Sequence, residues 1–379
     1  MSAAEATNGG RPPRVLMLLE HGAASHWWES SLPVLRASGV ELTIATVFGR
    51  GPLHENLERA GCGPVLTLGC RTSRDYPRGA LVLARLIREH ESDVIHANET
   101  IAGTICGIGG KLARRGVRIF HRHHNIINDR RQVLFSRLAS RWTDLTMAVS
   151  KSSAQHAQEI DGVPPSRIRV AYNGVRELRR VPAEEVTALR HRLAIPAAAP
   201  VFLVVARLWK EKGQRTLLEV MPALTAQLPH PPHVVLVGSG PEEASLRRQA
   251  EQPGGAVVHF VGHQLDVAPW YALADVVVVP SFQESFSLSA VEAMSCRRPV
   301  VASRLGGLVE VVDDGVTGVL VNPGDAGALA GGLHELLGSP EKMERMGKAG
   351  YERFRARFTL EAMIAGWRAV YGEAMANAG

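Results

Sequence analysis

The sequence predicts an α/β fold with two Rossmann-like domains, each a doubly wound parallel sheet covered by helices. Short apolar runs alternate with stretches of helical periodicity along the whole chain, as is typical of parallel sheets with helices on both faces. A polar, proline-bearing stretch over residues 177–200 breaks this alternation once, and the alternation then restarts. The 379 residues are also enough for two cores. We therefore expect one domain over residues 1–178 and a second over residues 179–358.

Six strands are expected in the first domain. The apolar runs that predict them are RVLMLL (14–19), ELTIATV (41–47), DVIHA (93–97), VRIFH (117–121), DLTMAVS (144–150) and RIRVAYNG (167–174). Segments with helical periodicity lie between them, such as residues 79–90 and 151–160. Because helices separate the strands along the chain, the strands are expected to run parallel.

The second domain repeats this pattern after a short predicted helix over residues 183–193. Its six expected strands are VFLVVARL (201–208), HVVLVG (233–238), AVVHFVG (256–262), DVVVVPS (275–281), RPVVAS (298–303) and TGVLVNP (317–323). The last segment, residues 359–378, has the apolar period of one amphipathic helix.

Composition excludes several classes of protein. A hydrophobic content of 45% with 21% charged residues is typical of soluble globular proteins. The polar start of the chain lacks the apolar region of a signal peptide, and no apolar run reaches the ~18 residues of a membrane span. The four cysteines show no C-x-x-C spacing, which disfavours zinc and disulfide frameworks and favours a reducing cytoplasm.

Basic residues are concentrated in the first half of the chain. Residues 1–178 carry a net charge of +7 and residues 179–379 a net charge of −1, with the highest basic density between Lys111 and Arg141. A solvated basic surface would explain this distribution. A phosphorylated acceptor or an anionic membrane surface as partner would explain it equally well. Nucleic acid is disfavoured, because no nucleic-acid-binding module is recognisable.

Doubly wound sheets bind ligands at the carboxyl ends of their strands, so the residues that follow each strand are the candidates. In the first half, Gly22 lies on the loop after the first strand, where a backbone without Cβ allows close approach to a ligand. The stretch HRHHN, residues 121–125, follows the fourth expected strand. A metal site is disfavoured there, since adjacent His123 and His124 point apart on an extended chain and no carboxylate or cysteine lies nearby at the spacing of metal ligands. One histidine that hydrogen-bonds a substrate is the favoured interpretation.

Cations and glycines follow two strands of the second half. Arg207 and Lys212 stand at a strand end, where two cations suit a phosphate or diphosphate, although a simple surface pair is the alternative. Gly238 and Gly240 begin a G-x-G-x-x-G pattern, but Glu243 replaces its third glycine. A nicotinamide cofactor is therefore disfavoured, whereas a loop that admits a nucleotide is still allowed.

The stretch ESFSLSAVE places Glu284 on a turn and Glu292 inside the next helix. Ser289 and Glu292 fit a capping box, which would explain Glu292 without any function. Eight helical residues advance ~12 Å, so the two carboxylates would touch different parts of a long ligand across the helix start. Anions favour such a helix N-terminus, and a diphosphate would fit between the glutamates.

Residues 280–303, PSFQESFSLSAVEAMSCRRPVVAS, resemble the E-x(7)-E signature of retaining glycosyltransferases of family 4, which have the GT-B fold. The resemblance includes ARLWKEKG, VGSGPEEASL, YNGV, ALADVVVVPS and GGLVEVVDDGVTGVLVNPGDAGALA, in the order of the family. It covers nearly all of the second half. The first half matches more loosely, through its first strand and loop, DVIHAN and the histidine-bearing strand end.

The resemblance implies a role for each matching residue. Arg207 and Lys212 would hold the donor diphosphate, Glu284 would contact the donor sugar, and Glu292 would bind the ribose hydroxyls. The other residues implied in donor binding are Gly22, Gly238, Gly240, Ser285, Phe286, Ser287 and Leu288, the last three through backbone amides. His124, with His123 as the alternative, would lie near the sugar being transferred.

The resemblance also implies the reaction. A hexose or N-acetylhexosamine would pass from a nucleotide-diphosphate sugar to an acceptor with retention of configuration, without a metal or other cofactor. The acceptor would bind the first domain, against which the final helix (359–379) would pack, and a cleft would close around both substrates. The basic first domain suggests an anionic or lipid-linked acceptor, a cytoplasmic enzyme peripheral on the inner face of the membrane, and a role in cell-envelope or exopolysaccharide synthesis.

Departures from the family pattern keep alternatives open. Ala206 and Ser285 stand where the family often has glycine, and the first loop is thinned to HGAAS. These changes put the choice of sugar in question. A glycosyltransferase of secondary metabolism, a GT-B sugar-nucleotide epimerase, a glycosidase and a catalytically silent nucleotide-sugar-binding partner protein are the alternatives. Dependence on a nucleotide separates the glycosidase from the others.

Overall fold

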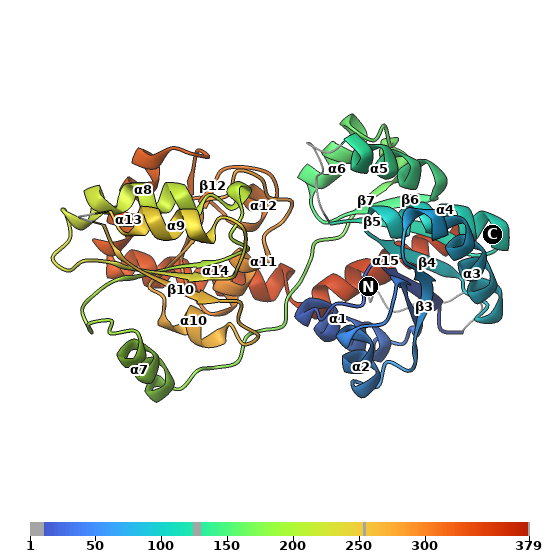
Figure 1. The fold of residues 1–379 in the computed structure, drawn as a ribbon, viewed down its shortest axis with the longest axis horizontal. Coiled ribbons are helices and arrows are strands. Elements are labelled where there is room, and N and C mark those ends of the chain that lie inside the picture. The colour runs from blue at the N-terminus through green and yellow to red at the C-terminus, as the bar shows by residue number, and fades with distance from the viewer. Residues whose placement is uncertain (1–10, 124–129, 253–254, 378–379) are drawn as a thin grey trace. The chain divides into compact units, whose positions relative to one another are not determined.

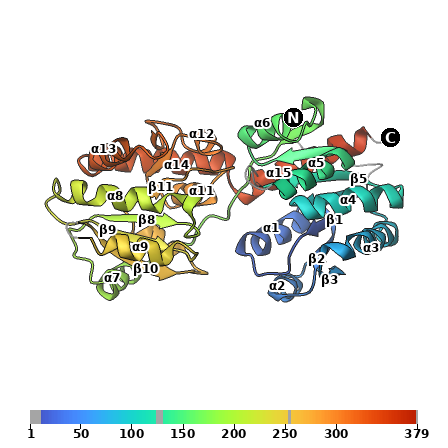
Figure 2. The ribbon, with the colours of Figure 1, turned by 45° about the horizontal axis from the view of Figure 1, so that its top comes forward.

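The computed structural model describes residues 11–123, 130–252 and 255–377. For residues 130 and 131 it describes only the backbone. The chain divides into two compact units, one formed by Met1–Val175 with Leu360–Gly379 and the other by Arg176–Thr359. Helices lie on both faces of the sheet in each unit (Figures 1 and 2).

In the described part of the first unit, seven parallel strands form one sheet in the order β3-β2-β1-β4-β5-β6-β7. The strands are β1 (Arg14–Leu19), β2 (Glu41–Phe48), β3 (Val65–Cys70), β4 (Val94–Asn98), β5 (Val117–Arg122), β6 (Leu145–Ala148) and β7 (Ile168–Val170). The helices are α1 (His26–Ala37), α2 (Pro52–Arg59), α3 (Tyr76–Glu89), α4 (Thr100–Ala113), α5 (Arg130–Trp142), α6 (Lys151–Glu159) and α15 (Leu360–Ala376), with short 3₁₀ turns η1 (Ser73–Asp75) and η2 (Pro165–Arg167).

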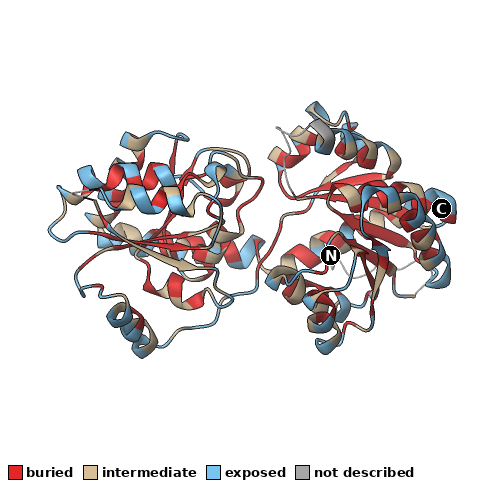
Figure 3. Ribbon diagram, viewed as in Figure 1, coloured by how far each residue is buried: buried red, intermediate tan, exposed pale blue. Residues whose placement is uncertain are grey.

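The sheet of the first unit is buried on both faces. Val15, Met17 and Leu19 of β1 belong to one core cluster, whereas Leu16 and Leu18 belong to another on the opposite face. Successive residues of a strand point to opposite faces, so a strand covered on both sides must be apolar throughout. The central strands β1, β4 and β5 are accordingly almost entirely buried, as Figure 3 shows.

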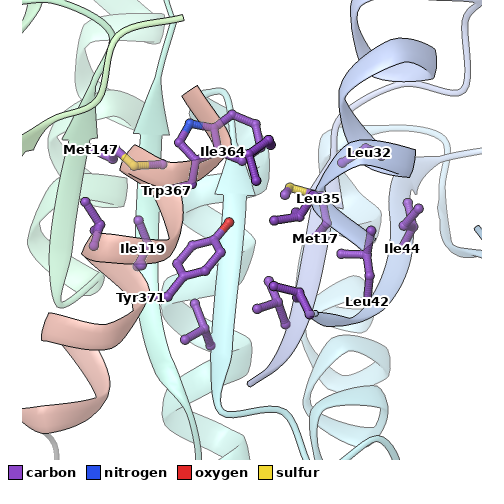
Figure 4. Packing of buried hydrophobic residues seen from close by; sticks show 14 of the residues in the cluster. Met17, Leu32, Leu35, Leu42, Ile44, Ile119, Met147, Ile364, Trp367 and Tyr371 are labelled. Carbon is purple, nitrogen blue, oxygen red and sulfur yellow. The ribbon is translucent and has the colours of Figure 1, made fainter. Parts of the chain in front are cut away.

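The last helix, α15, completes one of these two clusters. Its buried residues recur at helical spacing, and they include Trp367 at 0% and Tyr371 at 1% exposure. In Figure 4 both rings project from α15 toward the strands that carry Met17 and Ile119. Burying one such large apolar side chain contributes about 1.5–3 kcal/mol, so the first unit depends on the end of the chain for its core.

In the described part of the second unit, six parallel strands form a sheet in the order β10-β9-β8-β11-β12-β13. The strands are β8 (Val201–Val205), β9 (His233–Val237), β10 (Val257–Gly262), β11 (Val276–Val279), β12 (Val300–Ser303) and β13 (Gly318–Val321). The helices are α7 (Ala183–Arg192), α8 (Gln214–Thr225), α9 (Glu243–Ala250), α10 (Ala268–Leu273), α11 (Leu288–Ser295), α12 (Leu308–Val311), α13 (Ala326–Leu337) and α14 (Pro340–Arg357), with the 3₁₀ turn η3 (Lys210–Lys212).

Strand order fixes where ligands can enter each unit. In both sheets the order reverses beside the first strand, between β1 and β4 in one and between β8 and β11 in the other. Loops on the two sides of such a switch point diverge, and they leave a crevice at the carboxyl ends of the strands. The α/β prediction with two Rossmann-like sheets is therefore confirmed.

The sequence analysis expected six strands in the first domain and missed one, β3. β3 was not predicted, because this edge strand is only partly buried and lacks a continuous apolar run. The stretch 177–200 belongs to the second unit, where Arg179 pairs with Asp266 and Glu185.

Candidate active site

At the switch point of the second sheet, Lys212 and Glu284 form an ion pair. Lys212 ends η3, after β8, and Glu284 lies on the loop that follows β11. The Lys212 Nζ to Glu284 Oε2 distance is 2.8 Å, and the two side chains are only 18% and 14% exposed. The sequence placed both residues at strand ends, and the adjacency of β8 and β11 brings them together.

Gly213 holds the same two loops in contact. Its φ is +69°, and a Cβ there would lie 1.9 Å from the carbonyl oxygen of Pro280, a distance no side chain could adopt. The Phe282 amide also donates to the Glu211 carbonyl at 2.7 Å. Glycine after Lys212 is therefore required for the loops to approach each other, and this approach positions the ion pair.

Arg207 does not join this pair. Its side chain is 60% exposed, its guanidinium lies 3.9 Å from Glu211, and it stacks over the ring of Trp209 at 4.8 Å. The two cations that the sequence predicted to act together thus have different partners in this structure. Arg207 is nevertheless anchored through its carbonyl, which accepts a hydrogen bond from Gln214 Nε2 at 2.9 Å.

Glu292 lies in α11, and its Oε2 accepts a hydrogen bond from the Tyr271 hydroxyl at 2.7 Å. Tyr271, on α10, is wholly buried. Burial raises the pKa of Glu292 to about 7, and the Tyr271 hydrogen bond opposes part of that rise. Glu292 is therefore poised between its neutral and charged forms near neutral pH. Sequence reasoning missed Tyr271, whose role depends on the packing of two helices.

The start of α11 differs from the capping box expected at Ser289. Ser287 is the N-cap, with φ of +88°, and its Oγ accepts from the Ala290 amide at 3.4 Å. The Ser289–Glu292 box was therefore wrong, and capping does not explain Glu292. The Phe286 side chain is buried against Phe358, so a role of Phe286 toward a donor would fall to its backbone. The implied contacts of Ser285 and Leu288 stay predictions.

The predicted donor-site glycines pack against other loops. A Cβ on Gly238 would lie 2.0 Å from the Ala206 carbonyl oxygen, and one on Gly240 would lie 2.3 Å from that of Leu208. At Gly22, a Cβ would meet His54 Cε1 at 2.7 Å. These contacts explain each glycine by the close approach of protein to protein, without a ligand.

In the first unit, His123 follows β5 and Asn98 is the last residue of β4, and these two strands are neighbours in the sheet. His123 Nε2 lies 3.1 Å from Asn98 Oδ1. The rings of Trp27 and Trp28 lie nearly perpendicular to the His123 ring, with centroids 5.4 and 5.7 Å from it. His124, which the sequence analysis favoured, lies outside the described residues.

Two glutamates missed by the sequence analysis lie at the same switch point. Glu20 follows β1, and its Oε1 accepts from the Ile101 amide at the start of α4 at 2.6 Å. Glu99 follows β4 with φ of +71°, a conformation uncommon outside glycine. Burial raises the pKa of each carboxyl to about 7. In the sequence, the only feature that could have singled out these glutamates was their position after a predicted strand.

Behind His123 lies a buried chain of polar rings. The Tyr371 hydroxyl is 2.6 Å from His96 Nδ1, and His96 Nε2 is 2.9 Å from His121 Nδ1. Burial lowers the pKa of His96 to about 3 and that of His121 well below its usual range. Both rings are therefore neutral near pH 7, and they connect α15 with β5, the strand that His123 follows.

Three arginines follow β3 at the same edge of the first sheet. Arg71, Arg74 and Arg78 are exposed. Asp75 shapes their turn by accepting from the amides of Arg71 and Thr72 at 2.8 and 2.9 Å. The sequence analysis missed this group because it missed β3. Cations at a carboxyl edge suit an anionic ligand.

The described residues offer neither a metal-binding cluster nor a membrane-spanning helix. Among them, no group of three or more His, Cys, Asp or Glu side chains is arranged to hold a metal ion. No helix within the described ranges combines the length and the hydropathy that crossing a bilayer requires.

Comparison with known families places both parts of the chain. Residues 32–177 match the model described as Glycosyltransferase Family 4, and residues 185–353 match the model described as Glycosyl transferases group 1. The D-inositol 3-phosphate glycosyltransferase of Thermobispora bispora is 32% identical over 351 residues, which cover 86% of this chain and 79% of that protein. A second such enzyme, from Catenulispora acidiphila, is 32% identical over 309 residues, with 75% and 71% covered.

Solved structures agree with the family match. The Anabaena protein Alr3699/HepE, in complex with UDP and glucose, superposes with a TM-score of 0.80 at 25% identity, covering 94% of this chain and 98% of that one. WaaG, a glycosyltransferase involved in lipopolysaccharide biosynthesis, superposes with a TM-score of 0.70 at 15% identity, covering 94% and 98%, and shows the shared fold. The chain belongs to the group 1 glycosyltransferases of the family 4 type and has the GT-B fold.

Proposed function

We propose that this glycosyltransferase moves a hexose or N-acetylhexosamine from a nucleotide-diphosphate sugar to an anionic acceptor, with retention of anomeric configuration. One observation carries the donor half of this proposal: the Lys212–Glu284 pair lies at the switch point of the sheet whose next helix, α11, holds Glu292. A cation and two carboxylates around a helix start suit the phosphates, sugar and ribose of one long ligand.

The leaving group dictates the role of the cations. Breaking the bond between the anomeric carbon and the phosphate oxygen leaves an additional negative charge on the diphosphate. Lys212, already held by Glu284, meets this charge without moving far, and Arg207 approaches from its exposed position beside Trp209. Positive groups placed in advance lower the barrier, and with the dipole of α11 they serve in place of a metal ion.

Glu292 accepts the ribose hydroxyls of the donor in this proposal. The Tyr271 hydroxyl holds one of its oxygens, so the carboxylate is oriented before the nucleotide arrives. A uridine nucleotide is the favoured donor class, because the Anabaena protein at 25% identity is described in complex with UDP and glucose. Glu284 contacts the sugar while it pairs with Lys212.

In the first unit, His123 or His124 lies near the transferred sugar. Support for His123 comes from its contacts with Asn98 and with the two tryptophans, which fix the ring. When the Asn98 oxygen accepts, Nε2 carries the proton and Nδ1 is the basic nitrogen of the neutral ring.

An anionic acceptor is supported by two facts. Arg71, Arg74 and Arg78 stand at the carboxyl edge of the first sheet. The relatives from Thermobispora and Catenulispora are named for a phosphorylated acceptor, D-inositol 3-phosphate. Together with the net positive charge of the first half, these facts favour a phosphorylated or lipid-linked acceptor. The enzyme would then act at the inner membrane surface, in cell-envelope or exopolysaccharide synthesis.

Thermal unfolding against a panel of UDP-, GDP-, ADP- and dTDP-sugars tests the donor. A ligand at ~100 times its Kd adds about 2.7 kcal/mol of stability, and we expect this for one nucleotide class. Release of the nucleotide with EDTA present then tests the absence of a metal, and NMR of the early product tests retention. If no nucleotide sugar stabilises the protein at millimolar concentration, a silent partner protein becomes the better interpretation.

A further inference from the structure

The first unit has a pocket at the edge of its sheet opposite to Asn98 and His123. The pocket has a volume of about 770 Å³, and it lies where β4, β5 and β6 begin. Its floor is apolar and includes Val117, Leu145 and Met375, the last of these from α15. A pocket of about 300–1,000 Å³ is typical of small-molecule sites. β4 spans only five residues, so roughly 15 Å separates this pocket from the carboxyl edge.

The two acidic residues in the wall of the pocket are already paired with arginines. Asp93 accepts from Arg11 Nη2 at 2.7 Å and from the Arg14 amide at 3.0 Å. Asp144 accepts from Nε of Arg118 and from its backbone amide, both at 2.8 Å. These carboxylates therefore repel an incoming anion much less than free ones would.

Three further cations in the wall have no such partner. Lys111, Arg114 and Arg115 are exposed at the end of α4, and among the described residues no carboxylate lies within ion-pair distance of any of them. Arg115 spends one N–H on the Glu91 carbonyl at 3.0 Å. Arg14 lowers the pKa of the nearby Glu91 carboxyl, and the Arg115 charge also lowers it. The pocket therefore keeps three cations outside ion pairs, of which Arg115 is offset in part by Glu91.

The turn after α4 carries Arg114 and Arg115. Arg114 is left-handed, with φ of +54°, and Gly116 follows with φ of +76°. A Cβ on Gly116 would lie 2.5 Å from Ile95 Cδ1, so the turn is packed onto the sheet. One cation is expected at a helix C-terminus, where it stabilises the helix by about 0.3–1 kcal/mol. That effect does not explain three cations around one cavity.

We infer that this pocket binds the phosphate group of a ligand other than the sugar donor. Arginine N–H groups and the Lys111 ammonium match phosphate oxygens, and the apolar floor takes the carbon skeleton that bears the phosphate. A phosphorylated metabolite and the headgroup of an anionic phospholipid share this chemistry. Lys212, Glu284 and Glu292 all belong to the second unit, so a ligand in this pocket should not compete with the donor.

The test compares Lys111→Gln/Arg115→Gln with the control Arg59→Gln/Arg85→Gln in the full chain, with UDP present to occupy the donor site. The control removes the same charge from exposed arginines of α2 and α3, outside the pocket. The probes are inorganic phosphate, by calorimetry, and phosphatidylglycerol–phosphatidylcholine vesicles, by co-sedimentation. Each cation near an anionic surface contributes about 1 kcal/mol, so the pocket variant should lose about thirtyfold in affinity.

The two arms separate the sources of phosphate. A loss confined to inorganic phosphate assigns a soluble ligand, and a loss confined to vesicles assigns a lipid headgroup. Equal binding of both probes by wild type, pocket variant and control overturns the inference, as does an equal loss in the control. Circular dichroism and stabilisation by UDP show whether the double variant folds. If it does not, Lys111→Glu alone is expected to weaken binding of the same probe.

Discussion

The Lys212 ammonium lies 2.8 Å from the Glu284 carboxylate, and less than a fifth of either side chain is exposed. The pair joins the loop after β8 to the loop after β11, 72 residues apart in sequence. A pair this shielded from solvent is less screened by salt than a surface pair. It therefore presents a fixed cation where the proposed diphosphate would lie.

Replacing Lys212 by Met should affect both stability and donor binding. The change leaves the Glu284 carboxylate largely buried without its partner, at a cost of about 1–3 kcal/mol in the free energy of unfolding. UDP should bind at least tenfold more weakly, as calorimetry would measure. The Glu284→Gln variant and the double variant complete a cycle, for which we expect a coupling of about 0.5–3 kcal/mol. Undiminished UDP binding by Lys212→Met would exclude the diphosphate role.

Replacing Arg207 by Ala should reduce turnover without unfolding the protein. Its guanidinium is mostly exposed, so stability should change little, whereas the loss of one charge-stabilising group costs about 2–4 kcal/mol in the transition state. The measurement is the rate at which UDP is released from a UDP-sugar with water as acceptor. Lys210→Ala, an exposed cation three residues away, is the matched control. Equal rates for both variants and wild type would remove Arg207 from the mechanism.

Binding of UDP-glucose should strengthen as the pH rises from 6 to 8. Burial raises the pKa of Glu292 to about 7, so near pH 6 only about a tenth of the protein carries the charged carboxylate, and the apparent affinity falls about tenfold. UDP-glucose is a suitable probe because its diphosphate has no proton to lose in this range. Glu292→Gln should bind weakly at every pH, with a flat profile.

The same carboxyl should make stability depend on pH with the opposite sign. The folded chain holds its proton up to about pH 7, whereas the unfolded chain loses it near the ordinary value of 4.5. The folded state therefore binds more protons between these values, and its stability falls as the pH rises through them. Denaturant unfolding of wild type minus Glu292→Gln isolates this contribution. Tyr271→Phe removes the hydrogen bond that opposes the rise in the pKa of Glu292. In this variant the loss of stability with rising pH should therefore continue above pH 7.

Gly213→Ala should destabilise the protein and displace Lys212. The new Cβ would overlap the Pro280 carbonyl oxygen in a backbone of positive φ. Gly315→Ala is a close control, since Gly315 has φ of +76° and a Cβ there would meet nothing within 4 Å. Strain of this backbone alone costs about 1–3 kcal/mol. Thermal unfolding should show a larger loss at Gly213, and equal losses would mean that the loops separate freely.

The two parallel sheets followed from the sequence because strands buried on both faces read as unbroken apolar runs, as in β11. β3 did not, since an edge strand with half-exposed residues has no such run. The partnership of Lys212 with Glu284 depends on which strands lie side by side. The hydrogen bond between Tyr271 and Glu292 depends on how two helices pack. No local sequence pattern encodes this hydrogen bond or the Lys212–Glu284 pair.

Arg207 shows a different limit. Its position after a strand was predictable, but its direction was not, because the stacking on Trp209 and the contact with Glu211 are decided by local side-chain packing. The roles of His123 and His124 illustrate the same point. Adjacent residues of an extended chain send their side chains in opposite directions, so the sequence alone could not choose between the two histidines.

The packing of α15 has a consequence for biosynthesis. Trp367 and Tyr371 fill the core of the first unit, yet every residue of the second unit is translated before them. While the ribosome makes the second unit, apolar side chains such as Met17 and Ile119 lack the residues of α15 that share their core cluster. A nascent chain with this order of synthesis must keep its first unit incomplete and in need of protection from aggregation until the last helix emerges.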